Sequence, residues 1–472
     1  MNSCACGSVV TRASAQTNRD RRISSSCTPD CLIACMSRPP YARGRDRPNL
    51  GATGRCRTRR GGVSCWTPGR CGTRRTSGGS GPGSSLSIIG GQMTGFAVTL
   101  QVYRMTHSSA AVGAVGLATG APLIILGLFG GSVADAVDRR LLVLITNWGS
   151  IVVSALLAAQ AFLGLGLLWP LYVLVAVQAL LGGIGAPARR TFVPRLLAAD
   201  QVAAGVALNQ LNFQLGMMAG PALAGVVTAA GGLRLCYLAD VVSFAGTLYA
   251  LSRLPPMPPQ DGATRPGVTA VVEGLRFIRH RPVLAGVFLA DLDAMVLGMP
   301  FALFPALNEA HFGGTAQTLG LLTAAPAIGG LLGSTLSGPA GQASRPGRTL
   351  LAAVMVWGLA IAGFGLAHTL WLGLVLLVLA GAADTTSVII RSTIVQVATP
   401  DRFRGRVTGV DFVIGAGGPQ LGNFRAGAVA SVTSPGASAV GGGLATVLGA
   451  ALLKVAIPAL SRYAVPARER AD

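Results

Sequence analysis

Hydrophobic residues dominate the chain from Leu86 onward, where apolar stretches of roughly 18 to 25 residues alternate with short polar segments. A helix of about 20 apolar residues is long enough to cross the hydrocarbon core of a bilayer. Membrane-spanning strands instead alternate apolar and polar residues, and these continuous runs do not. The pattern therefore predicts an all-α polytopic membrane protein.

Polar breaks divide this hydrophobic region into twelve predicted transmembrane helices. The expected spans are 86–103, 111–133, 141–164, 168–188, 205–230, 233–252, 283–308, 316–338, 349–367, 369–390, 406–430 and 439–461. The first is short for a bilayer, and the two glycine-rich spans, 316–338 and 406–430, are the least distinct.

The longest internal connection, residues 253–282, falls midway between the spans. It opens with LPPMPP and continues with VTAVVEGLRFIRHRP, which predicts a short amphipathic helix. We interpret it as a cytoplasmic linker between two six-helix halves, 85–252 and 283–462, with a cytoplasmic tail at 463–472.

Arginine positions predict the orientation of the helices. If both termini are cytoplasmic, the inner loops and tail hold nineteen arginines, Arg391 among them, and the outer loops hold only Arg104 and Arg234. Because positively charged loops remain on the cytoplasmic side, we expect both termini to be cytoplasmic and the protein to lie in a bacterial inner membrane.

Residues 1–84 have a different composition from the rest of the chain. They contain 15 arginines, three acidic residues and eight of the nine cysteines, so they supply +12 of the net charge of +21. Such a segment cannot bury enough apolar surface to fold alone. We interpret it as a disordered extension or as sequence upstream of the true start, in preference to a metal site, a lipoprotein signal or a nucleic-acid-binding tail.

Three segments of the first half recur about 200 residues later in the same order. GLATGAP at 116–122 returns as GLLTAAP at 320–326, RTFVPRLLAADQV at 190–202 returns as RSTIVQVATPDRF at 391–403, and GPALAG at 220–225 returns as GPQLG at 418–422. Parallel repeats of this kind are typical of secondary transporters whose substrate cavity lies between two halves.

The loop between the second and third predicted helices reads GGSVADAVDRR and resembles the Gly-x-x-x-Asp-x-x-x-Arg-Arg motif of the major facilitator superfamily. The matching residues are Gly131, Asp135, Arg139 and Arg140, with Asp138 beside them. The resemblance implies the twelve-helix major facilitator fold and a gating loop that stabilises one access state. An ordinary charged turn is the alternative.

The fifth predicted helix contains Gly216-x-x-x-Gly220-Pro221-x-x-Ala224-Gly225, similar to a motif of proton-coupled antiporters in that superfamily. The alternative is simple helix packing through Gly-x-x-x-Gly. The segments LQVYRMTHSSAAVGAVGLA, MPFALFPAL and RGRVTGVDFVIGAGGPQLGNFRAGAVAS resemble the enterobactin-exporter-like branch. That branch implies efflux of catecholate siderophores or drugs. Directly before helix 1 this chain has the segment SGPGSSL, where it differs from the branch. This difference bears on whether helix 1 is complete.

Charged residues inside predicted spans are candidates for substrate or proton binding, because burying them in a bilayer is costly. Asp291 and Asp293 lie about 200° apart on a helix and cannot share a face. Asp411 and Arg425 are too far apart on the eleventh helix to pair. A guanidinium binds anions and stacks on aromatic rings, so Arg425 is a candidate for binding an anionic or catechol-bearing solute. Solvated or snorkelling side chains are the alternatives.

Asn209 and Asn212 share a face of the fifth helix, where amides either bind polar substrates or join helices. No phosphate-binding loop, metal-ligand set or nucleophile–base set is evident, so we expect no enzyme activity, no metal and no cofactor. We expect a monomer in the lipid bilayer that exports a small molecule using the proton gradient, with no nucleic-acid partner. An uptake symporter and an inactive, N-terminally damaged paralogue are the alternatives.

Overall fold

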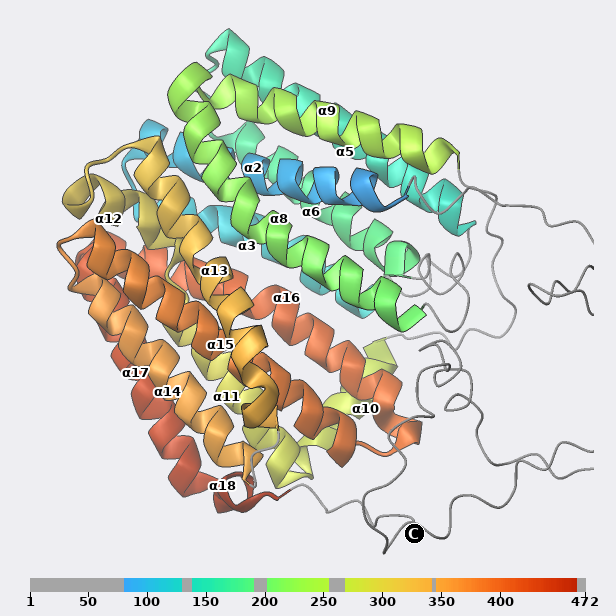
Figure 1. The fold of residues 1–472 in the computed structure, drawn as a ribbon, viewed down its shortest axis with the longest axis vertical. Coiled ribbons are helices and arrows are strands. Elements are labelled where there is room, and N and C mark those ends of the chain that lie inside the picture. Colours follow the sequence, from blue (N-terminus) through green and yellow to red (C-terminus); the bar gives the residue numbers. More distant parts are fainter. Residues whose placement is uncertain (1–79, 130–137, 191–201, 254–267, 342–344, 465–472) are drawn as a thin grey trace, which may run out of the picture. The chain divides into compact units, whose positions relative to one another are not determined.

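The computed structural model describes residues 80–129, 138–190, 202–253, 268–341 and 345–464, all of them within one compact unit, residues 73–472. Every regular element in these residues is a helix (Figure 1), so the all-α prediction is confirmed. Residues 1–79, Gly131, Asp135, residues 254–267 of the predicted linker and residues 465–472 of the predicted tail lie outside the described residues.

The N-terminal half is a bundle of membrane-length helices joined by short connections. Its helices are α2 (Ser80–Thr106), α3 (Ser109–Phe129), α5 (Arg139–Leu163), α6 (Trp169–Arg190), α8 (Val202–Gly231) and α9 (Leu233–Ser252). Asp138 caps the start of α5, since its carboxylate accepts hydrogen bonds from the amides of Arg140 and Leu141. The first helix is longer than the expected 86–103.

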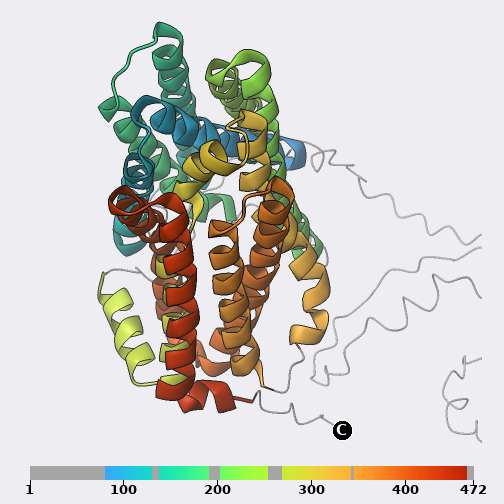
Figure 2. The same cartoon turned by 90° about the vertical axis from the view of Figure 1, so that its left-hand side faces the viewer.

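The C-terminal half begins after the amphipathic helix α10 (Val268–Arg279), which matches the helix predicted there. Its elements are α11 (Pro282–Gly298), the 3-10 turn η1 (Phe301–Leu303), α12 (Phe304–His311), α13 (Ala316–Gly341), α14 (Pro346–Gly365), α15 (Leu370–Ala398), α16 (Asp401–Val432), α17 (Pro435–Ala456) and the short α18 (Pro458–Arg462). Figure 2 shows the two halves as separate groups of helices.

Ten stretches of the described residues are long and apolar enough to cross a membrane. The remaining two of the twelve expected spans correspond to α2 and α16, which have 27 and 32 residues. Small polar residues in α2 and charged residues in α16 lower their hydropathy, yet α2 packs against α8 and α9, and α16 packs against α3. The twelve-helix architecture follows.

Two predicted spans are corrected by the structure. The expected helix 283–308 ends at Gly298 and resumes as η1 and α12, because Pro300 and Pro305 lack the amide donor that a continuous helix requires. The expected span 369–390 continues to Ala398. This extension places Arg391 inside a helix and not in a loop.

The ends of the bundle differ in charge, and we name them by it. The arginine-rich end contains Arg139, Arg253, Arg345 and Arg404, and the arginine-poor end contains Arg104 and Arg234. At the arginine-poor end the His107 side chain approaches the Glu309 carboxylate of α12 to 3.7 Å, which links the two halves.

The halves meet through α3 with α16 and through α8 with α13 (Figure 1). Backbone atoms approach closely where glycines replace side chains: Gly427 of α16 contacts Ser109 of α3, and Gly225 of α8 contacts Gly320 of α13. These contacts lie in the part of the bundle nearer the arginine-poor end. A buried hydrophobic core continues across both halves there.

The connecting helix α10 is attached to α16. The Phe277 and Phe403 rings stack at 4.2 Å, the Glu273 carboxylate lies 2.9 Å from Arg406, and Gly274 packs against the Arg406 carbonyl. Ile278 is buried in a cluster with Val407 and Val410. The C-terminal half therefore covers the side of α10 that carries Gly274, Phe277 and Ile278, while Val272 and Leu275 stay exposed.

Candidate functional site

A cavity of about 450 Å³ lies between the two halves. Both halves supply its polar lining: Gln92, Gln178, Gln420, Asn423, Thr94, Thr99, Thr119 and Thr323. Phe96, Phe301 and Phe304 add aromatic surface, and no ionisable side chain is among the described lining residues. Amides, hydroxyls and aromatic rings together suit a solute with both polar and apolar parts.

The break after α11 shapes this cavity. Because the helix stops before Pro300, the Ala302 amide is free to donate a hydrogen bond to Asn423 Oδ1 of α16 at 3.3 Å. On the facing helix, Gly116 and Gly120 of α3 leave room for the Gln420 side chain. The broken helix thus places backbone and side-chain amides at the centre of the bundle.

The glycine motif of the fifth predicted helix makes two different interfaces. Gly216 and Gly220 of α8 face Ile88 and Gln92 of α2 in the same half. At Gly225 a Cβ atom would lie 2.6 Å from the carbonyl oxygen of Ala316 in the other half. The motif therefore packs α8 within its own half and also against α13 across the interface.

Its partial copy in α16 packs in a related way. Gly418 and Gly422 face Met295 of α11, the first helix of the second half, just as the α8 glycines face α2, the first helix of the first half. Pro221 lies within α8 and Pro419 within α16. The sequence repeat is thus accompanied by a repeated helix contact.

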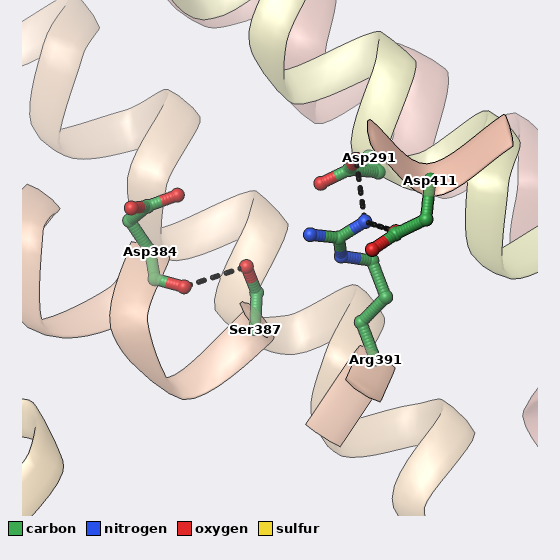
Figure 3. Close-up of polar contacts among 5 residues, drawn as sticks. All are labelled: Asp291, Asp384, Ser387, Arg391 and Asp411. Carbon is green, nitrogen blue, oxygen red and sulfur yellow. Dashed lines mark hydrogen bonds and ion pairs between the residues drawn. The ribbon is translucent and has the colours of Figure 1, made fainter. Parts of the chain in front are cut away.

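A buried charged cluster joins α11, α15 and α16 (Figure 3). Arg391 Nη1 lies 3.1 Å from Asp291 Oδ2 and also donates a hydrogen bond to Asp411 Oδ1. The Asp291 side chain is 6% exposed, whereas the Asp411 side chain is 41% exposed. One guanidinium is thus shared by a buried and a half-exposed carboxylate, which leaves one negative charge uncompensated.

Asp384 lies about two turns before Arg391 on α15. Its backbone carbonyl accepts a hydrogen bond from Ser387 Oγ at 2.8 Å, and the ion pairs drawn for Arg391 are with Asp291 and Asp411 (Figure 3). A third acid therefore lies close to the shared guanidinium without contacting it.

The other candidate charges point elsewhere. Asp293 packs against Gly449 of α17, on a different side of α11 from Asp291, which agrees with the expected angular separation. Arg425 donates a hydrogen bond to the Leu297 carbonyl and lies beside Gly442. Neither belongs to the lining of the central cavity, and Arg425 does not contact Asp411.

Asn209 is exposed and Asn212 half-buried on α8, and neither is among the cavity-lining residues. Of the predicted gating loop, the structure describes Asp138, Arg139 and Arg140. Asp138 caps α5, and Arg140 Nη2 donates to the Ser252 carbonyl at 2.7 Å, which joins α5 to the end of α9. The predicted gating role remains a prediction.

Sequence reasoning missed Asp240, Asp384 and the position of Arg391. Asp240 of α9 is fully buried and accepts hydrogen bonds from Thr94 and Ser154, each at 2.7 Å, and from Ser243 at 3.4 Å. The sequence feature that could have identified Asp240 is the presence of an acid within the apolar run CYLADVV. Thr94 also lines the central cavity, so its hydrogen bond connects the Asp240 carboxylate to a side chain of the cavity wall.

The sequence profile of the transmembrane secretion effector family matches residues 83–471. The chain belongs to this family. It is 28% identical over 364 residues to proteins named enterobactin exporter EntS, among them those of Shigella boydii serotype 18 and Citrobacter koseri. The alignments cover 77% of this chain and 87% of each relative. The protein is therefore an enterobactin-exporter-like transporter of the major facilitator superfamily.

Solved structures share the fold at low sequence identity. The nucleoside transporter NupG aligns with a TM-score of 0.61 and 14% identity, over 81% of this chain and 99% of its own. An inward-facing bacterial homologue of the iron transporter ferroportin aligns with a TM-score of 0.61 and 16% identity, over 81% and 97%. Family and fold together establish a multi-pass membrane transporter.

Proposed function

We propose that this protein is a proton-coupled exporter of a siderophore-like or hydrophobic small molecule in the bacterial inner membrane, with both termini cytoplasmic. The observation that carries the proposal is the cavity of about 450 Å³ between the halves, with amide, hydroxyl and aromatic lining from both. A solute bound there contacts both halves at once, so its binding is sensitive to their relative position. The relatives named enterobactin exporters support the direction of transport.

Alternating access requires the contacts between the halves to break at one end while they form at the other. Here the close contacts between α8 and α13, and the approach of His107 to Glu309, lie nearer the arginine-poor end. We assign this arrangement to a state closed toward the outside. The close interface at Gly225 and Gly320 is the one that must separate for release.

Proton coupling needs a group that is stable both with and without a proton. Asp291 and Asp411 share Arg391, so together the three carry a net negative charge that one proton neutralises. Since Asp411 is partly exposed and Asp291 buried, a proton that enters this cluster leaves Arg391 paired with the carboxylate that stays ionised. The cluster therefore couples protonation to the packing of α11, α15 and α16.

An efflux panel in cells lacking their own exporters tests the proposal, using a catecholate siderophore, a macrolide and a dye. We expect the wild type to lower the internal concentration of at least one solute, and a protonophore to abolish this effect. Asp291→Asn should reduce the rate about tenfold or more. Asp401→Asn is the matched control and should transport normally, because Asp401 is exposed and its ion pair with Arg404 is exposed too.

Three outcomes contradict the proposal. Protonophore-sensitive accumulation of a solute would show an uptake symporter. Efflux that persists with a protonophore would exclude proton coupling. The absence of transport of any solute, from a chain that is folded and inserted, would favour the inactive paralogue.

A further inference from the structure

A second cavity, of about 500 Å³, adjoins the central one. Gly91, Gln92, Leu123 and Ala179 line both, so the two cavities are adjacent. The remaining wall of the second cavity is mostly apolar, with Ile88, Phe213 and Phe244, but it also contains the guanidinium-bearing Arg189. Among the described residues that line either cavity, Arg189 is the only one with an ionisable side chain.

The Arg189 side chain does not extend toward the end of its helix. An arginine near a membrane boundary ordinarily stretches outward to reach water. Arg189, close to the C-terminal end of α6, instead turns back by one turn: a Cβ at Gly185 would lie 3.2 Å from Arg189 Nη2 and 2.9 Å from Thr146 Oγ1 of α5. The missing side chain at Gly185 makes room for the guanidinium.

Arg189 Nε is buried and has no hydrogen-bond partner in the described part of the chain. No carboxylate there forms an ion pair with it either, in contrast to Arg391, which binds two acids. A buried, unpaired charge is costly. An arrangement that holds the guanidinium beside a cavity, with no counter-ion among the residues that the structure describes, is suited to a counter-ion supplied by the ligand.

We propose that Arg189 binds an anionic group of the transported solute, so that the substrate class is an organic anion: a carboxylate, sulfonate or phosphate attached to an apolar body. This inference rests on the proposed transport function and specifies its substrate. The forked donors of a guanidinium bind such groups through paired hydrogen bonds. The apolar body lies against Phe213 and Phe244, and its polar substituents reach Gln92 and the central cavity.

Arg189 replaces Arg425 as the anion-binding residue. Arg425 already donates to the Leu297 carbonyl and is not among the described residues that line either cavity. The position of Arg189 also fits a route of entry, because α6 ends at the arginine-rich end, which we assign to the cytoplasm. An anion entering there meets this guanidinium before it reaches the central cavity.

Two dyes that share a xanthene body test the inference: fluorescein, which is anionic, and rhodamine 6G, which is cationic. Binding to the purified full chain in detergent is measured by fluorescence anisotropy without any gradient. We expect fluorescein to bind the wild type about tenfold or more tightly than rhodamine 6G, and Arg189→Gln to weaken fluorescein binding about tenfold. Arg189→Lys should weaken it less, because it keeps the charge.

Arg348→Gln is the matched control, since Arg348 is exposed at the same end of the bundle and lines neither cavity. It should leave the affinity for both dyes unchanged. The inference is wrong if the wild type does not prefer fluorescein, if Arg189→Gln leaves fluorescein binding unchanged, or if it weakens both dyes equally, as a purely structural role would.

Efflux from proteoliposomes separates this inference from the proposed function. If fluorescein binding depends on Arg189 but a proton gradient drives no efflux, the proton-coupled exporter is wrong and the anion site stands. If gradient-driven efflux occurs but is equally fast with Arg189→Gln and for both dyes, the exporter stands and the anion site is wrong.

Discussion

Arg391 connects three helices through single side-chain contacts. We expect Arg391→Gln to lower the free energy of unfolding by about 3 kcal/mol or more, because it leaves Asp291 as a buried, uncompensated charge. Asp291→Asn should cost less, since Arg391 keeps Asp411 as its partner. The midpoints of thermal unfolding of the purified chain in detergent provide the measurement.

The double variant Asp291→Asn/Arg391→Gln should recover part of the loss, because both charges are then gone. Arg404→Gln removes an exposed pair with Asp401 and serves as the control, expected to change stability by less than about 1 kcal/mol. Equal destabilisation by Arg391→Gln and Arg404→Gln would show that the cluster carries no structural role.

The sequence located individual acids of this cluster but not their partner. A charge within an apolar run is visible locally, so Asp291 and Asp411 were candidates from the start. Arg391 follows an apolar run beside a polar segment, where arginine most often marks a cytoplasmic loop. Only the packing of α15 against its neighbours shows that it lies inside the bundle.

At the scale of helices, the α8–α13 interface depends on two backbones in contact. Gly225→Val should push them apart, because even a Cβ would meet the Ala316 carbonyl at 2.6 Å. Overpacking of this kind costs about 1–3 kcal/mol. We expect a lower midpoint of thermal unfolding and an efflux rate reduced about tenfold.

Gly441→Val in α17 is the matched control, since no atom lies within 4 Å of a Cβ at that position. If Gly225→Val retains both wild-type stability and wild-type efflux, the close approach of α8 and α13 is not required for transport.

Helix positions were largely predictable because hydropathy is a local property. The break in the seventh span was not predicted, although Gly298, Pro300 and Pro305 were all visible in the sequence. In a continuous apolar run, proline is tolerated when neighbouring helices satisfy the freed backbone groups. Whether a helix bends or stops therefore depends on its partners, here Asn423 at the Ala302 amide.

At the scale of the whole molecule, the proposed export mechanism requires the arginine-poor end to open. Cysteines in place of His107 and Glu309, whose side chains approach to 3.7 Å, can be joined by a short bismaleimide. With serine in place of the eight cysteines of residues 1–84, and Cys236 buried, the pair is the accessible target. We expect efflux to stop in proportion to the cross-linked fraction.

Each single cysteine variant treated with the same reagent controls for modification alone and should remain active. Full efflux from fully cross-linked protein would show that the halves do not separate at this end.

The sequence repeat predicted two similar halves, but it did not show which of their surfaces meet. The choice of surfaces depends on the sizes of side chains distributed over four helices, α3, α8, α13 and α16.

The attachment of α10 to α16 makes the connection between the halves mechanically one-sided. Stacked rings, an ion pair and a buried isoleucine hold α10 to the C-terminal half. We therefore expect α10 to move together with α16. A force on the exposed Arg276 and Arg279 side chains of α10 would therefore act mainly on the C-terminal half.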